Sequence, residues 1–282
     1  MMARSLMISA IKPNPLILLL LLSTLAIAQH SQRSLPDDNL AYPVLITLKN
    51  GGTGFGFYLN DKAATYLVTA KHVLFDLVTG KVRSNELELL SYSKNLSDPT
   101  PNVITVDLSV LDSANIKPHP SEDIAVLELF SVRSAQSLSA LSGVTVKQSA
   151  AQGLLGANLG VLRKFDQVLV GNEIVVMGYP TSLGLRAMPQ IDSRRPLLRK
   201  GIVAGQNTEK RSIILDCPSY PGNSGGPALE VDTDGPFSRR YSIIGVIREF
   251  VPYADGGKTF TITANSGYSV ATPLDFVLEL IK

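Results

Sequence analysis

The sequence predicts an all-β fold that ends in one short helix. Short runs rich in β-branched and aromatic residues are separated by Gly, Pro, Asn and Asp, which is typical of β-strands joined by turns. Only the last ten residues place their apolar side chains at helical spacing. With 282 residues, 45% of them apolar, the chain can bury a sizeable core in one or two subdomains.

Ten runs have the composition of strands and are separated by turn residues. They are Pro43–Lys49, Gly54–Leu59, Ala64–Ala70, Glu86–Tyr92, Val103–Leu111, Asp123–Phe130, Glu173–Gly178, Ser212–Cys217, Ser242–Val251 and Gly267–Ala271. The helix is expected over Pro273–Lys282 with Thr272 as its cap. The alternation of strands and turns fits either a barrel or a sandwich.

Residues 1–28 have the three parts of a secretory signal peptide. Arg4 and Lys12 form a positive start, an apolar run follows, and Ala26-Ile27-Ala28 resembles a cleavage site. The apolar run is short for a membrane-spanning helix, although an uncleaved anchor is the alternative. We therefore expect an exported protein, periplasmic or secreted and bacterial in type, with residues 29–42 as an exposed leader and no stable membrane association after cleavage.

Charge and cysteine content exclude several classes of function. Without residues 1–28 the chain has 24 basic and 24 acidic side chains, a balance that argues against nucleic acid as the partner. Cys217 is the single cysteine, so no intramolecular disulfide can form, and a buried thiol is favoured over a reactive one. No phosphate-cradling loop or metal-ligand spacing is present, so we expect neither cofactor nor metal.

Two segments lack strand periodicity. Residues Ser131 to Arg163 are rich in Ser, Ala, Gly and Gln, and we interpret them as a connection between two halves, with a short helix at most. Residues Thr181 to Pro196 carry Arg186, Arg194 and Arg195. This second segment is either a solvated loop or a flap that borders a substrate cleft.

The most informative stretch is Tyr220-Pro221-Gly222-Asn223-Ser224-Gly225-Gly226-Pro227. Clustered glycines allow a tight turn that presents the Ser224 hydroxyl and directs the N–H groups of Gly222 and Ser224 toward one point. Such a turn combines a nucleophile with an oxyanion hole, although a Gly/Pro loop with a merely polar serine has the same composition. A serine becomes nucleophilic only when a base accepts its proton and a third group orients that base.

Candidate partners for Ser224 exist upstream. His72 follows the strand-like run Ala64–Ala70, whereas His30 lies in the leader and His119 between two prolines. Asp123 opens a run of apolar residues, where a carboxylate is costly unless it is paired. Taken singly, His72 could be structural and Asp123 could simply close a turn.

Together, three blocks resemble the signature motifs of trypsin-like serine proteases, in the order of that family. They are Thr69-Ala70-Lys71-His72, Asp123-Ile124-Ala125-Val126-Leu127 and Gly222-Asn223-Ser224-Gly225-Gly226-Pro227. The last block is most similar to the bacterial Deg/HtrA branch. Four further stretches match that branch: Gly52–Phe57, Val175–Pro180, Lys200–Val203 and Tyr268–Pro273.

The resemblance covers residues 43–282 and implies two six-stranded antiparallel β-barrels with the active site in the cleft between them. The first barrel would span about 43–130, the connection 131–165 and the second barrel 166–282. His72, Asp123 and Ser224 would form the catalytic triad, and the N–H groups of Gly222 and Ser224 would bind the oxyanion. The substrates would be proteins or peptides, and activity should fall as the pH drops through the range in which histidine protonates.

The sequence departs from the family in several places. Asn223 replaces the Asp that pairs with a freed N-terminus in zymogen-derived members, which argues against activation by cleavage. Pro218 stands where trypsin has its specificity Asp, and Phe250 stands where trypsin has a glycine. With Ser219, these residues predict a pocket for small or medium apolar side chains. Arg248 falls where a small hydroxyl residue supports the triad carboxylate, so it could pair with Asp123 or obstruct the substrate.

Other functions remain open at this stage. The changes at Arg248 and Phe250 would also suit a catalytically silent, protease-like binding module. An esterase with the same three residues is a further alternative, although esterases of the strand–elbow–helix type have a different fold. Deg/HtrA proteins usually carry a PDZ domain after the protease, and we expect none here. Deg/HtrA relatives often form trimers, so an oligomer is an open question.

Overall fold

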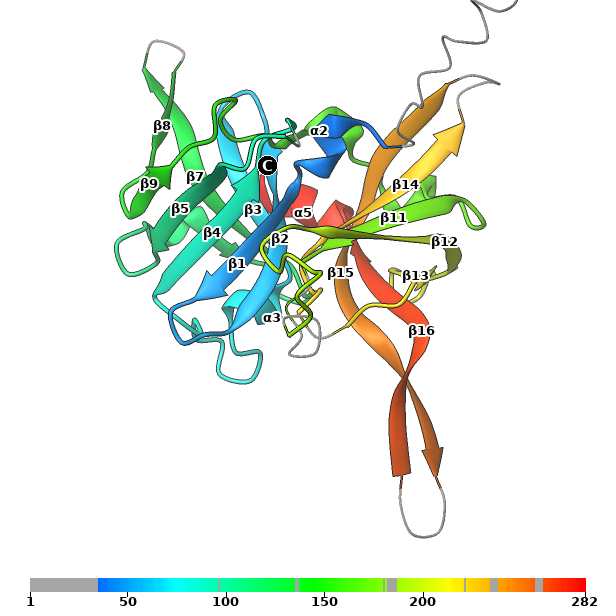
Figure 1. Ribbon diagram of the computed structural model, residues 1–282. Helices are drawn as coiled ribbons and strands as arrows, with labels where there is room; N and C mark the ends of the chain where they lie inside the picture. The colour runs from blue at the N-terminus through cyan, green and yellow to red at the C-terminus, as the bar shows by residue number, and fades with distance from the viewer. Residues whose placement is uncertain are drawn as a thin grey trace, which may run out of the picture. The chain divides into compact units, whose positions relative to one another are not determined.

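The computed structural model describes residues 35–95, 97–134, 137–179, 181, 187–220, 222–233, 238–256 and 261–282. The expected signal peptide, residues 1–28, lies outside the described residues. Residues 37–282 form one compact unit made of two antiparallel β-sheets and a few short helices, as Figure 1 shows. The prediction of an all-β, two-sheet fold with a C-terminal helix is confirmed.

The first sheet is an open half-barrel with ten strands. Its main path runs β6-β7-β3-β2-β1-β4-β5-β9, while β8 pairs with β7, and β10 pairs with β2 in parallel. The strands are β1 (Pro43–Leu48), β2 (Thr53–Asn60), β3 (Ala64–Thr69), β4 (Glu86–Tyr92), β5 (Pro101–Asp107), β6 (Ile116–Pro118), β7 (Ala125–Ser134), β8 (Ser137–Ala140), β9 (Val144–Gln148) and β10 (Ala157–Asn158).

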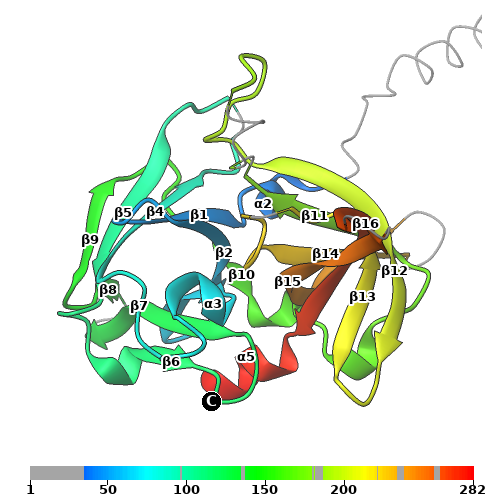
Figure 2. The same cartoon turned by 90° about the horizontal axis from the view of Figure 1, so that it is seen from below.

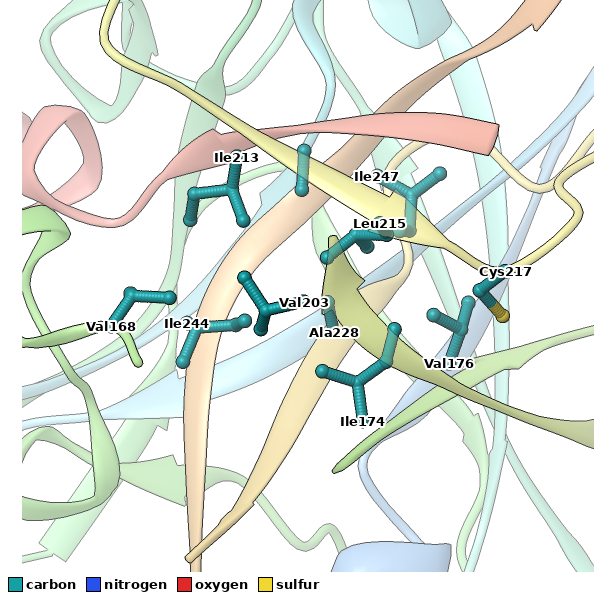
Figure 3. Packing of buried hydrophobic residues seen from close by; sticks show 11 residues of the cluster. Val168, Ile174, Val176, Val203, Ile213, Leu215, Cys217, Ala228, Ile244 and Ile247 are labelled. Atoms are coloured by element: carbon teal, nitrogen blue, oxygen red, sulfur yellow. The ribbon is translucent and has the colours of Figure 1, made fainter. Parts of the chain in front are cut away.

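The second sheet is a closed barrel of six strands in the order β11-β12-β13-β16-β15-β14. These strands are β11 (Glu173–Gly178), β12 (Leu197–Asn207), β13 (Ser212–Asp216), β14 (Pro227–Thr233), β15 (Arg239–Gly256) and β16 (Thr261–Pro273). Figure 3 shows its core of small and branched side chains: Val168, Ile174, Val176, Val203, Ile213, Leu215, Cys217, Ala228, Ile244, Ile247 and Ala271.

The described helices are short and lie at chain connections. They are α2 (Asp37–Leu40), α3 (Lys71–Leu74) and α5 (Asp275–Leu280), with 3₁₀ turns at Ser113–Asn115, Leu159–Val161 and Phe165–Gln167. In Figure 2, α5 lies beside β6 and β7 of the first sheet. There the ring of Phe276 packs edge-on against His119, which also bonds Glu279. Helix α5 thereby fastens the end of the chain to the first sheet.

Tyr179 joins the two sheets next to the site. It follows β11 of the second barrel, is almost fully buried, and donates its hydroxyl to the carbonyl groups of Pro43 and Leu90 in the first sheet. Its ring lies 5.5 Å from that of Phe55, centroid to centroid. Burying an aromatic side chain of this size contributes about 2 kcal/mol, and its paired hydroxyl avoids a desolvation penalty.

The structure corrects three predictions about elements. The segment from Ser131 to Arg163 is not an irregular connection, since it adds β8, β9 and β10 to the first sheet. Thr272 does not cap α5, because it is a buried residue of β16 and Leu274 occupies the cap position. In the segment expected to be an exposed leader, α2 contains the buried residue Asn39.

Strands β12 and β14 were missing from the predicted set for physical reasons. β12 is largely half-exposed and carries Arg, Lys and two glycines, so it lacks a hydrophobic pattern. β14 contains Glu230, which is fully buried. Its carboxylate pairs with Arg163 at 2.8 Å and accepts from the Asn172 side chain at 2.7 Å, and this pairing makes a charge tolerable inside the strand.

Candidate active site

Strand pairing in the first sheet places His72 beside Asp123. β3 and β7 are antiparallel neighbours, and Thr69 at the end of β3 is paired with Ala125 at the start of β7. The residue following one strand therefore lies at the same edge as the residue preceding the other. His72 is in the one-turn helix α3 directly after β3, and Asp123 comes two residues before β7. The register alone brings the two side chains together.

Two hydrogen bonds fix the His72 ring. Asp123 Oδ2 lies 2.7 Å from His72 Nδ1, and Asp123 Oδ1 accepts the His72 backbone N–H at 2.8 Å. An ionised carboxylate at Nδ1 holds the proton on that nitrogen, so Nε2 keeps a lone pair. The imidazole is 30% exposed whereas the Asp123 carboxylate is 9% exposed, so the ring is accessible and its orienting group is not.

The pKa of Asp123 is lowered. Burial by itself raises the pKa of a carboxyl group, but the hydrogen bonds from His72 and its charge outweigh that effect, and the Arg248 guanidinium adds to the lowering. Asp123 is therefore ionised at neutral pH, in the form that accepts both bonds from His72.

Ser224 sits on the loop between β13 and β14, and that loop depends on glycine. Gly222 and Gly225 have φ of +92° and +93°, in the left-handed region that glycine adopts without strain. A Cβ on Gly225 would overlap the Phe55 carbonyl and the Thr69 hydroxyl. The Phe55 N–H in turn donates to the Ser224 carbonyl at 2.9 Å, so the loop is fastened directly to the first sheet.

The Ser224 hydroxyl donates to the Arg248 carbonyl at 2.9 Å. In the described part of the chain it makes no hydrogen bond to the His72 ring. Both residues nevertheless line one pocket of about 350 Å³, together with Asp123. The remaining lining residues are Leu77, Ser219, Tyr220, Arg248, Glu249 and Phe250. The structure thus brings the three predicted residues into one pocket, with the hydroxyl turned toward β15.

The tentative substrate-binding residues are mostly at this pocket. Ser219, Arg248 and Phe250 line it, whereas Pro218 is half-buried and is not among the described lining residues. The Arg248 side chain pairs with Glu249 at 3.1 Å, and both are well exposed, so of the two alternatives considered for Arg248 the ion pair with Asp123 is not formed. The β-bulge between Ile247 and Glu249 accounts for its orientation, because the extra residue turns side chains at that point.

Sequence reasoning gave no role to Leu77 and Tyr220, which also line the pocket. Tyr220 is 39% exposed and its ring lies under the Arg199 guanidinium at 4.6 Å. A signal was present for both, since Tyr220 opens the glycine stretch and Leu77 follows α3. An aromatic or apolar residue close to a site motif and left in solvent is a candidate for substrate contact.

The arginine-bearing segment from Thr181 to Pro196 does not border this pocket where it is described. The Arg195 guanidinium lies 3.6 Å from the centroid of the Tyr92 ring and donates to the Asp98 carbonyl at 3.1 Å. It lines a different cavity of about 320 Å³ with Leu40 and Met177. Arg186 lies outside the described residues. Arg195 therefore holds the second barrel against the first sheet.

Cys217, the single cysteine, is buried and is not among the residues that line this pocket. Burial raises the pKa of the Cys217 thiol to about 11, in agreement with its predicted role as a buried residue. In the portion of the chain that the structure describes, no cluster of His, Cys, Asp and Glu could hold a metal ion.

The two packed antiparallel sheets, with a pocket that draws its lining from both, define a trypsin-like serine protease fold. The family model for the trypsin-like peptidase domain matches residues 52–235, which is more than half of the chain. The chain belongs to this family, and the predicted resemblance is confirmed.

Several solved protease structures are similar to this chain, all at low sequence identity. Deg5 is 21% identical over 86% of this chain and 88% of its own, with a TM-score of 0.48. A thermostable serine protease, AL20, from an extremophilic microorganism is 11% identical over 87% and 96%, with a TM-score of 0.50. The HtrA-type protease AlgW, solved with a tripeptide, is 17% identical over 86% of this chain and 59% of its own, with a TM-score of 0.44. Comparison with curated proteins gave no match.

Proposed function

We propose that this protein is an exported serine endopeptidase in which Ser224 is the nucleophile, His72 the base and Asp123 the group that orients the base. The observation that supports this most strongly is the pair of hydrogen bonds that Asp123 accepts from His72, in a pocket whose lining also includes Ser224. Membership of a peptidase family implies protein substrates.

The proposed reaction uses the free Nε2 of His72. Ser224 Oγ attacks the carbonyl carbon of the scissile bond while Nε2 takes the hydroxyl proton. The imidazolium then gives this proton to the leaving amine, and water repeats the sequence to release the acyl group. Asp123 stays ionised throughout, and its charge stabilises the imidazolium.

In the proposed mechanism, the Arg248 carbonyl holds the Ser224 hydroxyl in the free enzyme. The Ser224 hydroxyl is bonded to that carbonyl before substrate arrives. A peptide laid against β15 would offer a backbone N–H to the same oxygen, which releases the hydroxyl to rotate toward His72. Side-chain rotation is fast, on the picosecond to nanosecond scale for exposed groups, so it would not limit turnover.

The oxyanion would be stabilised by the N–H groups of Gly222 and Ser224. The left-handed conformation of Gly222 turns its peptide plane relative to its neighbours, and the loop is held in place by the Asn223 side chain, which accepts the Tyr220 N–H at 2.9 Å. Fixed backbone donors aimed at a developing negative charge lower the barrier by about 3 kcal/mol each.

Specificity for small or medium apolar residues remains our proposal, and it rests on the side chains of Leu77, Tyr220 and Phe250 in the lining of the pocket. Export rests on the pattern of residues 1–28 alone. Of the helices in the described residues, none has the length and hydropathy needed to cross a membrane.

One observation favours a second candidate, a catalytically silent binding module. The Ser224 hydroxyl is bonded to Arg248 and not to His72, which is the arrangement expected if the site no longer performs catalysis. In that case the pocket would bind a peptide without cleaving it.

Reaction with a fluorophosphonate probe separates the two candidates. The endopeptidase should be labelled at Ser224, and Ser224→Ala should abolish the label. Peptide-library cleavage then reports the residue preferred before the scissile bond. Absence of labelling under native conditions, in a protein that still binds peptide, would favour the module, and a profile dominated by Arg and Lys or by Phe and Tyr would reject the proposed specificity.

A further inference from the structure

His119 is a buried histidine that the proposed mechanism does not use. Only 5% of its surface is exposed. It opens the loop of residues 119–124 between β6 and β7, and the same loop carries Asp123. The loop is closed at its base, since the His119 N–H donates to the Ile124 carbonyl at 2.8 Å. The register of β3 and β7 brings Asp123 close to His72, but the exact position of its carboxylate depends on this loop.

One nitrogen of the His119 ring accepts backbone N–H groups of the loop. The Glu122 N–H donates to Nδ1 at 3.0 Å, and the Ser121 N–H points to the same nitrogen at 3.4 Å. A nitrogen that accepts a hydrogen bond carries no proton, so the proton of this ring is on Nε2. Because Glu122 directly precedes Asp123, the bond to its N–H fixes the backbone next to the carboxylate.

Helix α5 holds the ring from its other end. His119 Nε2 lies 3.2 Å from Glu279 Oε2 and donates to it, and the Phe276 ring packs edge-on with its centroid 5.1 Å away. The start of α5 is itself anchored, since Asp275 accepts the Phe165 N–H at 2.8 Å and pairs with Arg211 at 2.9 Å. Both ring nitrogens are therefore paired, as expected for a buried polar side chain.

The backbone of His119 is also tied to the segment that carries His72. The Lys71 ammonium donates to the His119 carbonyl at 2.6 Å, and Lys71 directly precedes His72 in α3. Asp123 in turn accepts the His72 backbone N–H. The segments that carry the proposed base and its orienting group are thus joined twice, once through Asp123 and once through His119.

The residues around His119 show why the loop needs this ring. Pro118, Pro120 and Ser121 are exposed, whereas His119 is buried, so the imidazole is the part of this half of the loop that is anchored inside the protein. The two prolines restrict the backbone conformation but cannot donate a backbone hydrogen bond. Surface loops are mobile unless such contacts fix them.

We infer that His119 is a positioning residue for Asp123. Its Nδ1 holds the backbone just before Asp123, so that the carboxylate meets both donors of His72, and α5 keeps the ring in place. His119 is not among the residues that line the pocket, so it acts through Asp123 and not on the substrate. The inference rests on the proposed endopeptidase function, because Asp123 orients the base of that mechanism.

Three substitutions separate the roles of the two ring nitrogens. His119→Asn places an amide oxygen where Nδ1 was, His119→Gln reaches only the position of Nε2, and His119→Ala removes both. The kcat for peptide hydrolysis should fall about tenfold or more in His119→Ala and His119→Gln, because a small displacement of a catalytic group is costly, and should stay within about threefold in His119→Asn. The KM should change by less than about twofold in all three, because the contacts to the substrate are unaltered.

Proton NMR of the free protein in water gives a measurement that does not depend on turnover. The proton on His72 Nδ1 lies in a short, charge-assisted hydrogen bond to Asp123, and such protons resonate far downfield. Loss of the signal in His72→Gln assigns it. The signal should persist in His119→Asn and should shift or disappear in His119→Ala and His119→Gln.

Asn102→Ala is the matched control for a purely structural loss. Asn102 is 1% exposed, and its side chain accepts the Ala150 N–H at 2.8 Å and donates to the Gly153 carbonyl at 3.0 Å. It thus holds a loop of the same sheet, but it does not line the pocket. Asn102→Ala should lower the thermal unfolding midpoint as His119→Ala does, while kcat and the His72 signal should stay as in the wild type.

Failure of the inference is distinguishable from failure of the proposed function. If the wild-type protein is neither labelled by fluorophosphonate nor active, the proposed function fails, and the His72 signal alone then decides whether His119 positions Asp123. In an active protein, His119→Ala with kcat within about twofold of wild type and an unchanged signal would overturn the inference. Equal losses of kcat in His119→Asn and His119→Gln, or in Asn102→Ala and His119→Ala, would also overturn it, because the ring would then only fill space or add stability.

Discussion

The two sheets contribute to the candidate site in different ways. In the first sheet, the register between β3 and β7 sets His72 beside Asp123, and two short hydrogen bonds complete the pair. In the second, Ser224 is on a loop that depends on left-handed glycines, and its hydroxyl is bonded to the Arg248 carbonyl. The proposed base and its orienting group are hydrogen-bonded without substrate, whereas the hydroxyl of the proposed nucleophile is bonded to a backbone carbonyl and not to His72.

This difference shows where the site is rigid and where it can change. A pair placed by strand register can be separated only if the sheet is disrupted, so His72 and Asp123 have one arrangement. The Ser224 hydroxyl is held by a single hydrogen bond, and in the proposed mechanism it exchanges the Arg248 carbonyl for His72 as its acceptor. If a peptide N–H occupies the Arg248 carbonyl, the equilibrium shifts toward His72. The proposed enzyme is therefore completed by its substrate on the side of the second barrel.

The largest effect is expected from Ser224→Ala, which removes the proposed nucleophile and leaves the His72–Asp123 pair intact. Peptide hydrolysis should fall by about 10⁴-fold or more, and fluorophosphonate labelling should disappear. The thermal unfolding midpoint should change little, because the hydroxyl makes a single hydrogen bond. Residual hydrolysis within about tenfold of the wild-type rate would show that another group attacks the substrate.

Much of this arrangement was predictable from the sequence, and the reasons are local. Each of three patterns is confined to a few neighbouring residues of the sequence. They are the glycines around a serine, a histidine just after a buried strand, and a carboxylate just before another buried strand. The pairing of β3 with β7 was not predicted, and the proximity of His72 and Asp123 was expected only from the family resemblance. The direction of the Ser224 hydroxyl could not be predicted, because it depends on the bulge near Arg248, which is a property of two paired strands.

The strands that the sequence did not predict also depend on contacts with residues far away in the sequence, or have no hydrophobic pattern of their own. β14 contains Glu230, whose burial depends on Arg163, a residue 67 positions away in the sequence. β9 is largely exposed, so its composition gives no hydrophobic pattern. Elements that are stabilised by distant partners leave a weak local signal.

Asp123→Asn tests the hydrogen-bonded pair of His72 and Asp123. The amide keeps the shape of the carboxylate but favours the wrong imidazole tautomer, so kcat should fall by about 10³- to 10⁴-fold with a smaller change in KM. Stability gives a second measurement. Because the folded-state pKa of Asp123 is lowered, its contribution to the free energy of unfolding is present above the unfolded-state pKa, about 3.9, and is lost as the pH falls through the lower folded value.

Urea unfolding of the wild-type protein and of Asp123→Asn at pH 7, 5, 4 and 3 checks the sign. The difference in unfolding free energy should be constant from pH 7 to 5 and should shrink below pH 4. Glu122→Gln, which changes a neighbouring half-buried carboxylate that does not bond His72, is the matched control and should show a much smaller dependence. A difference that stays constant down to pH 3 would contradict the lowered pKa.

Gly225→Ala tests the contact between the loop that carries Ser224 and the first sheet. A Cβ at this position would overlap the Phe55 carbonyl and the Thr69 hydroxyl, and φ of +93° is strained for alanine. We expect a loss of stability of roughly 2–4 kcal/mol and a 10- to 100-fold decrease in kcat/KM, because the loop must move away from the first sheet. Chemical denaturation and peptide hydrolysis measure these effects. Gly171→Ala has a similar φ and open space around it, so it should lose only about 1 kcal/mol.

The smallest effect is expected from Arg248→Ala, and it separates the role of the backbone at this position from that of the side chain. The group that holds the Ser224 hydroxyl is the Arg248 carbonyl, which the substitution leaves in place. The guanidinium contributes a long-range lowering of the Asp123 pKa and an exposed pair with Glu249, and exposed charges of this kind are worth about 0.2–1 kcal/mol. Hydrolysis of a short peptide should therefore stay within about fivefold of wild type, and Glu249→Ala should behave similarly. A loss of 100-fold or more on removing the guanidinium alone would show that the side chain positions Asp123 directly.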